Sequence, residues 1–217
     1  MKTRVKICCI KSFAEAQLAI RYGASALGFV SAMPSGPWPI SEELIADLIA
    51  QIPAGILTFL LTSKQDASSI IAQQRRTNAN TLQLVDSISL ETYQALRSEL
   101  PGVSIVQVIH VTGPEAIVAA QTVSPFVDAI LLDSGNPNLP VKQLGGTGRV
   151  HDWGISKTIC SQLQIPVYLA GGLNPDNVAE AIRAVQPFAV DICSGVRSNG
   201  ALDGKKLAHF FGQVVST

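Results

Sequence analysis

Short apolar runs alternate with amphipathic segments along the whole chain, about eight times. The runs are nearly continuous in Val, Ile, Leu, Phe and Ala, a pattern that is typical of parallel strands buried on both faces. We expect strands over residues 4–9, 25–30, 55–61, 81–85, 103–110, 126–132, 166–170 and 188–193. Strands that alternate with helices in this way predict an α/β protein with a parallel sheet.

Capping signals place several helix starts between these runs. Ser12 with Glu15, and Thr112 with Glu115, have the spacing of a capping box. Asn174 followed by proline predicts another helix start, and the last helix is expected over about residues 203–214.

Eight units in 217 residues give about 27 residues per unit, close to the lower size limit of (β/α)₈ barrels. We therefore predict an α/β fold of the (β/α)₈, or TIM-barrel, type, with residues 1–217 forming one domain. The alternative is a doubly wound open sheet, which usually has one crevice and a single phosphate loop.

Three glycine-rich turns favour the barrel, because each follows one of three consecutive late strands. They are LGGTGRVHDW at 144–153, AGGLNPDNV at 170–178 and SGVRSNG at 194–200. Glycine lets backbone amides approach a ligand, and phosphate sites in barrels commonly follow strands seven and eight. The three turns together predict a phosphorylated ligand.

Composition excludes several other classes of partner. Lys plus Arg equals Asp plus Glu, at 16 each, so nothing favours nucleic acid or an anionic membrane surface. No apolar run reaches membrane-spanning length, and the start of the chain is interpreted as a first strand and not a signal peptide, which predicts a cytoplasmic protein. Four cysteines without a CxxC pair predict neither zinc nor a disulfide framework, and reduced thiols are expected for at least three of them.

Polar residues at the carboxyl ends of barrel strands are the first catalytic candidates. Cys8 ends the first predicted strand, and Lys6 lies two residues earlier on the same face, where its charge favours a thiolate. A small buried thiol is an equally good interpretation of Cys8. Asp133 closes the run AILLD, where strand-end placement favours function over a turn cap.

Four other polar residues near strand ends are interpreted as structural. Asp86 and His110 follow strands four and five, where a loop cap and a satisfied core histidine are the expected roles. Asp128 and Asp191 lie within strands six and eight and are expected to support the barrel edge or the site.

At this point the chain resembles the phosphoribosylanthranilate isomerase family. The motifs that carry the resemblance are VKICCI at 5–10, LLDS at 131–134, GGTG at 145–148 with Asp152-Trp153 behind it, AGGLNPDNV at 170–178 and DICSGVR at 191–197. Their order and spacing hold over nearly the whole chain, so the resemblance exceeds a fold-level analogy.

The resemblance implies an Amadori rearrangement in tryptophan biosynthesis, with Asp133 as general acid and Cys8 as general base. It implies no metal and no organic cofactor, and a small phosphorylated substrate. The acid then needs a raised pKa, and the thiol needs local positive charge, for which Lys6 is the candidate. The substrate-binding residues that we expect are Lys6, Gly146, Thr147, Gly148, Arg149, Gly171, Gly172, Ser194, Gly195 and Arg197.

The chain departs from the family pattern at the anthranilate end. The loop at 31–41 has no arginine where the family has one for the anthranilate carboxylate, and QLVD at 83–86 stands for the family's QLHG. Cys9 replaces a glycine and is expected to face away from Cys8 on the strand; Arg197 replaces a glutamate. Arg149 or Arg197 is the candidate replacement cation.

Two other functions stay open from these departures. One is a related isomerase that acts on a different phosphorylated sugar. The other is a non-catalytic barrel that binds a phosphometabolite and is regulated through the thiols of Cys8, Cys9 and Cys193. Intact Cys8 and Asp133 favour catalysis. The sequence is compatible with a monomer or a homodimer.

Overall fold

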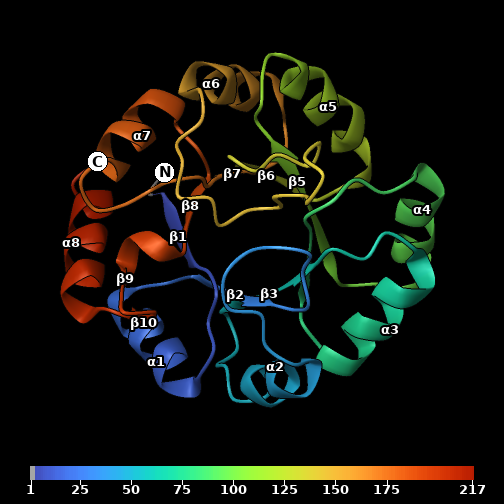
Figure 1. Ribbon diagram of the computed structural model, residues 1–217, viewed down its shortest axis with the longest axis horizontal. Helices are drawn as coiled ribbons and strands as arrows, with labels where there is room; N and C mark the ends of the chain where they lie inside the picture. Colours follow the sequence, from blue (N-terminus) through green and yellow to red (C-terminus); the bar gives the residue numbers. More distant parts are fainter. Residues whose placement is uncertain (1–2) are drawn as a thin grey trace.

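The computed structural model describes residues 3–217, and within them eight parallel strands close into a barrel in sequence order, with β8 beside β1 (Figure 1). The predicted (β/α)₈ barrel is confirmed. The strands are β1 (Arg4–Ile7), β2 (Ala26–Val30), β3 (Leu57–Thr62), β4 (Thr81–Leu84), β5 (Ser104–His110), β6 (Ala129–Asp133), β7 (Val167–Leu169) and β8 (Ala189–Ile192).

Helices follow the strands and surround the barrel (Figure 1). They are α1 (Phe13–Tyr22), α2 (Glu42–Ile49), α3 (Ala67–Thr77), α4 (Leu90–Glu99), α5 (Glu115–Val123), α6 (Trp153–Gln162), α7 (Val178–Val185) and α8 (Gly204–Val215). A short hairpin, β9 (Arg197–Ser198) and β10 (Ala201–Leu202), lies between β8 and α8. None of the helices in residues 3–217 is both long and apolar enough to cross a membrane.

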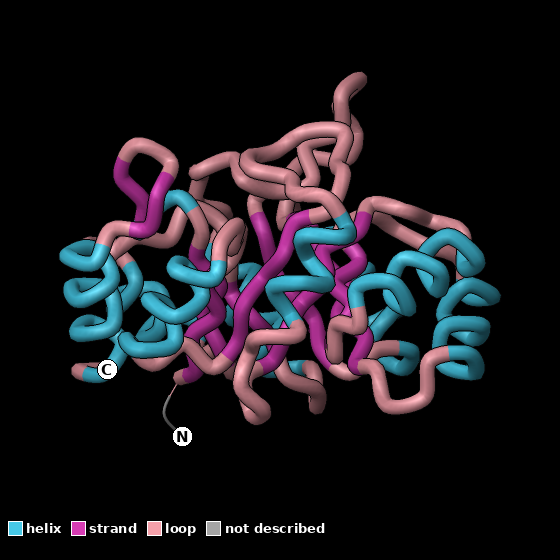
Figure 2. Tube along the Cα trace, turned by 90° about the horizontal axis from the view of Figure 1, so that it is seen from below, coloured by secondary structure: helices cyan, strands magenta, loops and turns pink. Residues whose placement is uncertain are grey.

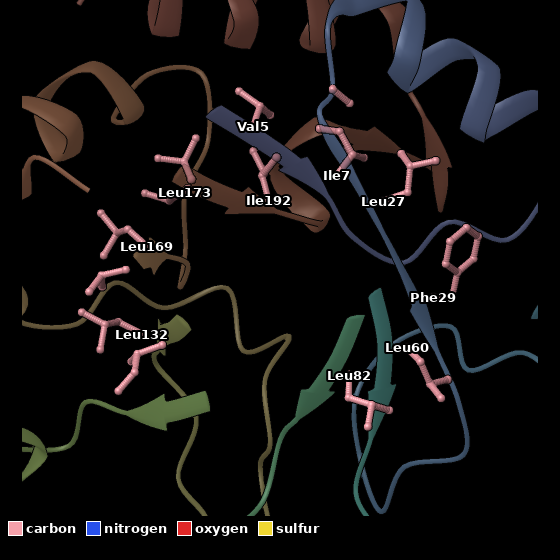
Figure 3. Packing of buried hydrophobic residues seen from close by; sticks show 14 of the residues in the cluster. Val5, Ile7, Leu27, Phe29, Leu60, Leu82, Leu132, Leu169, Leu173 and Ile192 are labelled. Atoms are coloured by element: carbon pink, nitrogen blue, oxygen red, sulfur yellow. The ribbon is translucent and has the colours of Figure 1, made fainter. Parts of the chain in front are cut away.

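Side chains of each strand alternate between two apolar layers. Leu27 and Phe29 of β2 face the helices and join the larger cluster between sheet and helices (Figure 3). Ala26 and Val30 of the same strand face the barrel interior. Because both faces are buried, the strands are nearly continuous apolar runs in the sequence, which explains why the pattern predicted them.

Several helix ends match their sequence signals. Ser12 accepts a hydrogen bond from the Glu15 amide at the start of α1, and Gly23 ends that helix with a φ of +107°. Asp203 caps α8 through the amides of Lys205 and Lys206, so the last helix begins where it was expected.

One predicted cap was wrong. Thr112 does not cap α5, because the helix begins after Pro114, and the Thr112 hydroxyl instead donates to the Glu115 carboxylate at 2.7 Å. Asn174 caps the turn that leads into α7: its side-chain oxygen accepts from the amides of Asp176 and Asn177 at 2.8 and 3.2 Å. Its carbonyl accepts from the amide of Val178, where α7 begins.

The loops at the carboxyl ends of the strands rise above the barrel, on the side opposite the amino ends of the strands (Figure 2). Residues 31–41 and 134–152 form the two longest of these loops and lie over the centre of the barrel (Figure 1). This is the face on which barrel enzymes build their active sites.

Candidate active site

A cavity opens at the carboxyl ends of the strands, beneath the 31–41 and 134–152 loops. Its polar wall comes from the ends of β1, β6, β7 and β8 and from their loops: Cys8, Cys9, Asp133, Gly145, Gly146, Thr147, Gly148, Gly171, Gly172, Asp191, Cys193 and Ser194. Its apolar wall includes Val30, Met33, Pro37, Leu61, Val85 and Leu144. The structure thus brings the two predicted catalytic residues and most of the predicted phosphate-binding residues to one cavity.

Cys8 is buried just beyond the end of β1, where its amide donates to the Ile192 carbonyl of β8 at 2.8 Å. Gly28 on the neighbouring strand leaves space for the thiol. A Cβ atom at Gly28 would lie 2.8 Å from the Cys8 Sγ and 3.1 Å from the Lys6 Nζ. The thiol can occupy its position because Gly28 on β2 has no side chain.

Lys6 lies below Cys8 inside the barrel, fully buried, with its Nζ 2.8 Å from the Asp191 Oδ2. Lys6 and Asp191 are Cα partners in the β1–β8 register, so barrel closure brings them together. Burial lowers the pKa of Lys6, but the Asp191 carboxylate and Cys8 outweigh it and raise the pKa, so the ammonium stays charged. Lys6 is thus occupied beneath the cavity floor and does not line the cavity.

Lys6 lowers the pKa of the Cys8 thiol, the direction expected from the sequence, but burial has the larger effect. Burial raises the pKa of the Cys8 thiol to about 11, against the smaller opposing effect of Lys6. Asp191 forms an ion pair with Lys6 and itself raises the pKa of Cys8. Before substrate binds, Cys8 is therefore a neutral thiol at physiological pH.

Asp133 ends β6 and is half-buried, with its Oδ1 accepting from the Ser134 amide at 2.7 Å. Desolvation raises the pKa of this carboxyl, while the Ser134 amide and His110 oppose the rise. The direction agrees with the one that a general acid requires.

The glycine-rich turns pack tightly against one another. A Cβ atom at Gly172 would lie 2.6 Å from the Arg149 carbonyl carbon, and one at Gly195 would overlap the Leu173 carbonyl oxygen. The β6, β7 and β8 loops therefore form one continuous wall. Gly195 lies behind this wall and not on the cavity surface, whereas Ser194 lines the cavity.

The structure does not place Arg197 in the cavity. Its guanidinium is buried and donates to both Glu15 oxygens at 2.7 and 3.0 Å and to the Cys9 carbonyl at 2.6 Å. Trp38 of the 31–41 loop packs over the same guanidinium, 4.9 Å from its centre to the ring centroid. Arg197 thus joins β9, α1 and the 31–41 loop, and it does not line the cavity.

Arg149 also lies outside the cavity lining, with an exposed guanidinium that donates to the neutral Gln143 Oε1 at 2.7 Å. Another cation near the cavity, Lys142, forms an ion pair with Asp86, which follows β4.

The interpretation of Cys9 was wrong in two respects. β1 ends at Ile7, and Cys9 has a φ of +62°, so strand alternation no longer applies and Cys9 lines the same cavity as Cys8. Cys9 also forms a disulfide with Cys193. Two of the four cysteines are therefore bonded to each other, contrary to the expected reduced thiols, and Cys8 and Cys160 are free.

Asp191 is a candidate site residue, whereas the sequence analysis expected it only to support the barrel edge or the site. It lines the cavity, and its Oδ1 is buried with no hydrogen-bond partner among residues 3–217. The sequence did contain a signal for this. Asp191 and Lys6 have opposite charges and occupy inward positions on strands that the predicted barrel makes neighbours. Of the other strand-end residues, His110 Nε2 lies 2.9 Å from the Val85 carbonyl oxygen, and Asp128 pairs with Arg97 at 2.8 Å.

No group of three or more His, Cys, Asp and Glu side chains in the described part of the chain is arranged to hold a metal ion. The chemistry that the cavity offers consists of a carboxyl with a raised pKa, a thiol above a buried ion pair, and a wall of backbone amides. The molecule is therefore a (β/α)₈ protein with a candidate acid–base site at the carboxyl ends of its strands.

A family model described as N-(5'phosphoribosyl)anthranilate (PRA) isomerase matches residues 5–213, and the chain belongs to this family. N-(5'-phosphoribosyl)anthranilate isomerase 2 of Methanosarcina mazei is 36% identical, over 95% of this chain and 92% of that relative. Phosphoribosyl anthranilate isomerase from Thermococcus kodakaraensis superimposes with a TM-score of 0.82 at 30% identity, over 100% of both chains.

A further solved isomerase of this name contains reduced 1-(o-carboxyphenylamino)-1-deoxyribulose 5-phosphate. It superimposes with a TM-score of 0.82 at 25% identity, over 99% of this chain and 100% of that one.

Proposed function

We propose that this chain isomerises N-(5-phosphoribosyl)anthranilate to 1-(2-carboxyphenylamino)-1-deoxyribulose 5-phosphate in tryptophan biosynthesis. The observation that carries the proposal is the presence of Cys8 and Asp133 on one cavity wall with the glycine loops of β6, β7 and β8. The ligand in the solved relative, a reduced form of this product, supports the same chemistry.

In this reaction the Asp133 carboxyl donates its proton to the furanose ring oxygen. The bond between that oxygen and C1′ breaks, and the nitrogen lone pair forms an iminium. The Cys8 thiolate then removes the C2′ proton, which gives an enol that tautomerises to the ketone. One proton enters and one leaves, so the substrate is isomerised without net oxidation, and general acid–base catalysis suffices.

The raised pKa values define which form of the free enzyme is active. With the pKa of Cys8 at about 11 and that of Asp133 raised from the usual carboxyl value, the pair shares one proton over a wide pH range. The productive arrangement puts this proton on Asp133, although the thiol holds it more tightly. The productive fraction is small but constant between the two pKa values.

The pH profile of kcat/KM is therefore expected to be flat around neutral pH. Below the pKa of Asp133 both groups are protonated and the base is lost, and above about 11 both are deprotonated and the acid is lost. Initial rates measured across the pH range check this. An ascending limb centred near neutral pH would show instead that Lys6 controls the thiol.

Backbone amides of the β7 loop are the best candidates for the phosphate. Within residues 3–217, the amides of Gly171 and Gly172 donate no hydrogen bond, and both residues line the cavity. Backbone amides that converge in a nest favour an anion. Ser194 lies on the adjacent β8 loop, and Gly146, Thr147 and Gly148 complete the wall.

The anthranilate carboxylate needs a cation from outside the 31–41 loop. Arg197 is paired with Glu15, and Lys142 is paired with Asp86. Among residues 3–217, the Arg149 guanidinium bonds only to the neutral Gln143. Arg149 can therefore turn toward the anthranilate ring without breaking an ion pair. Its guanidinium can bind both oxygens of the anthranilate carboxylate.

Arg149→Ala is expected to raise KM for phosphoribosylanthranilate roughly 10- to 100-fold, the effect of losing a hydrogen bond to a charged group. Inhibition by ribose 5-phosphate should change little, because it has no carboxylate. Arg75→Ala, which removes an exposed arginine paired with Glu99, is the matched control. An unchanged KM in Arg149→Ala would exclude this role.

A steady-state assay with phosphoribosylanthranilate, followed by the loss of its fluorescence, tests the proposed function directly. Turnover supports it. The arginine-free 31–41 loop favours one alternative, an isomerase for a different phosphorylated sugar, which the absence of turnover would select.

We further propose that residues 1–217 act as one domain, in the cytoplasm, as a monomer or a homodimer that takes a small phosphorylated substrate. Sedimentation of the purified chain distinguishes the two oligomeric states.

A further inference from the structure

We propose that the Cys9–Cys193 disulfide is a reversible thiol–disulfide exchange site that a dithiol opens, and that its state sets the affinity of the cavity for phosphate. Only the identity of the phosphorylated substrate rests on the proposed function. The bond itself and its effect on an inorganic anion are independent of turnover.

The disulfide joins two functional segments at the cavity. Cys9 follows the thiol residue Cys8, and Cys193 precedes Ser194 on the β8 loop. The two Cα atoms are 6.0 Å apart, and the residues are separated by 184 positions in the sequence. The bond therefore fixes the distance between the end of β1 and the loop expected to bind phosphate.

Closure of the barrel at this seam does not depend on the disulfide. β1 and β8 are paired along four residues, and the Cys8 amide donates to the Ile192 carbonyl at 2.8 Å. Arg197 separately holds the Cys9 carbonyl at 2.6 Å. Because these contacts persist without the bond, reduction is expected to leave the fold intact and to act locally.

The bond is accessible from one side. Cys9 is only 5% exposed, whereas Cys193 is partly exposed and Ser194 is exposed. A thiolate therefore reaches the Cys193 sulfur more easily than the Cys9 sulfur, and access is one of the factors that set the rate of exchange.

The exchange is balanced with a dithiol as the two-electron reductant. One thiolate of the dithiol attacks Cys193 Sγ, the bond to Cys9 Sγ breaks, and Cys9 leaves as a thiolate that takes up a proton. The second thiol of the reductant then attacks the mixed disulfide and releases Cys193 as a thiol. The reductant becomes a disulfide, and the protein gains two electrons and two protons.

Reduction must separate the two sulfur atoms to a non-bonded distance, on the order of 3.5–4 Å. Cys9 is buried and held through its carbonyl, so Cys193 is the residue that moves. Ser194 is the next residue and moves with it. The oxidised protein therefore presents the more ordered phosphate wall, and the reduced protein binds an anion more weakly.

The experiment compares the oxidised protein with the protein reduced by dithiothreitol. Thiol titration after denaturation without reductant should find only Cys8 and Cys160, and after reduction all four cysteines. The Kd for inorganic phosphate should rise by about 5-fold or more on reduction, the lower end of couplings between sites. By linkage, saturating phosphate should make the bond harder to reduce by the same factor.

Three variants sharpen the result. Cys9→Gly suits the φ of +62° at that position, and Cys193→Ser is nearly isosteric; each should bind phosphate with the weaker affinity whether or not dithiothreitol is present. Cys160→Ser removes a thiol outside the cavity and should keep the full response.

Four titratable thiols before reduction would overturn the proposal, and so would equal phosphate affinity in the two states. The chain could fail to turn over phosphoribosylanthranilate and still show two thiols before reduction and a higher Kd for phosphate after it. The proposed function would then be wrong, and the proposed exchange site would be supported.

Discussion

Asp133→Asn is expected to lower kcat by about 10²- to 10⁴-fold with little change in KM, the effect that general acid catalysis typically has. The amide oxygen of asparagine can still accept from the Ser134 amide, which bonds the Asp133 Oδ1 at 2.7 Å, so the loop conformation should persist. The amide cannot, however, supply a proton to the furanose oxygen. Steady-state kinetics with phosphoribosylanthranilate measure the effect.

Asp128→Asn is the matched control, since Asp128 directly precedes the same strand but pairs with Arg97 outside the cavity. It should keep near-wild-type turnover. Cys8→Ser should lose activity in the same range as Asp133→Asn, because a hydroxyl is a far weaker base than a thiolate. If Asp133→Asn or Cys8→Ser retained near-wild-type kcat, the role assigned to that residue would be wrong.

Arg197→Met is expected to lower the free energy of unfolding by about 3–5 kcal/mol, the usual cost of leaving one partner of a buried ion pair alone. Glu15 would lose both guanidinium hydrogen bonds, and Trp38 would lose the cation over its ring. Denaturant unfolding of the variant and the wild type measures the loss.

Two controls distinguish the loss of the buried Arg197–Glu15 pair from the loss of any arginine. Arg75→Met, at an exposed pair with Glu99, should cost about 1 kcal/mol or less. Arg197→Met combined with Glu15→Gln should recover part of the loss, because the unpaired charge is removed. A loss in Arg197→Met no larger than that in Arg75→Met would contradict the assignment.

The stability that the Arg197–Glu15 pair contributes is expected to depend on pH in a defined direction. Burial would raise the pKa of Glu15, but the hydrogen bonds from Arg197 outweigh it and lower the pKa in the folded protein. The contribution is therefore complete above the unfolded pKa of about 4.5 and disappears as the pH falls through the lower folded pKa. The difference between wild type and Arg197→Met should narrow in acid.

The barrel and the position of Asp133 could be predicted from sequence because both depend on local pattern. A strand buried on both faces is a continuous apolar run, and a carboxylate at its end has few structural uses. The rule that strand ends converge on one face then placed Cys8 and Asp133 together, although β7 and β8 lie between their two strands in the barrel.

Cys9 and Arg197 could not be placed in this way. Strand alternation assumes that the strand continues, and the φ of +62° at Cys9 breaks that assumption without a glycine to announce it. The Arg197 side chain is long, and its partner Glu15 lies 182 positions away, so no local spacing shows the pair. The position of Arg197 in the glycine motif at 191–197 instead suggested that it binds the substrate phosphate.

Lys6 and Asp191 were within reach of sequence reasoning. Each occupies an inward position, and the predicted barrel makes their strands neighbours. What the sequence could not supply was the register of β1 against β8, which sets whether the two charges meet or miss each other.

The closure of β1 on β8 also has a consequence for synthesis on the ribosome. Lys6 emerges early, and its counterion Asp191 follows 185 residues later. Until then, a nascent half-barrel that closed on itself would trap an ammonium without a partner, which is costly in an apolar interior. The lysine thus disfavours premature closure, and the catalytic end of the molecule can assemble only after Asp191 has left the exit tunnel.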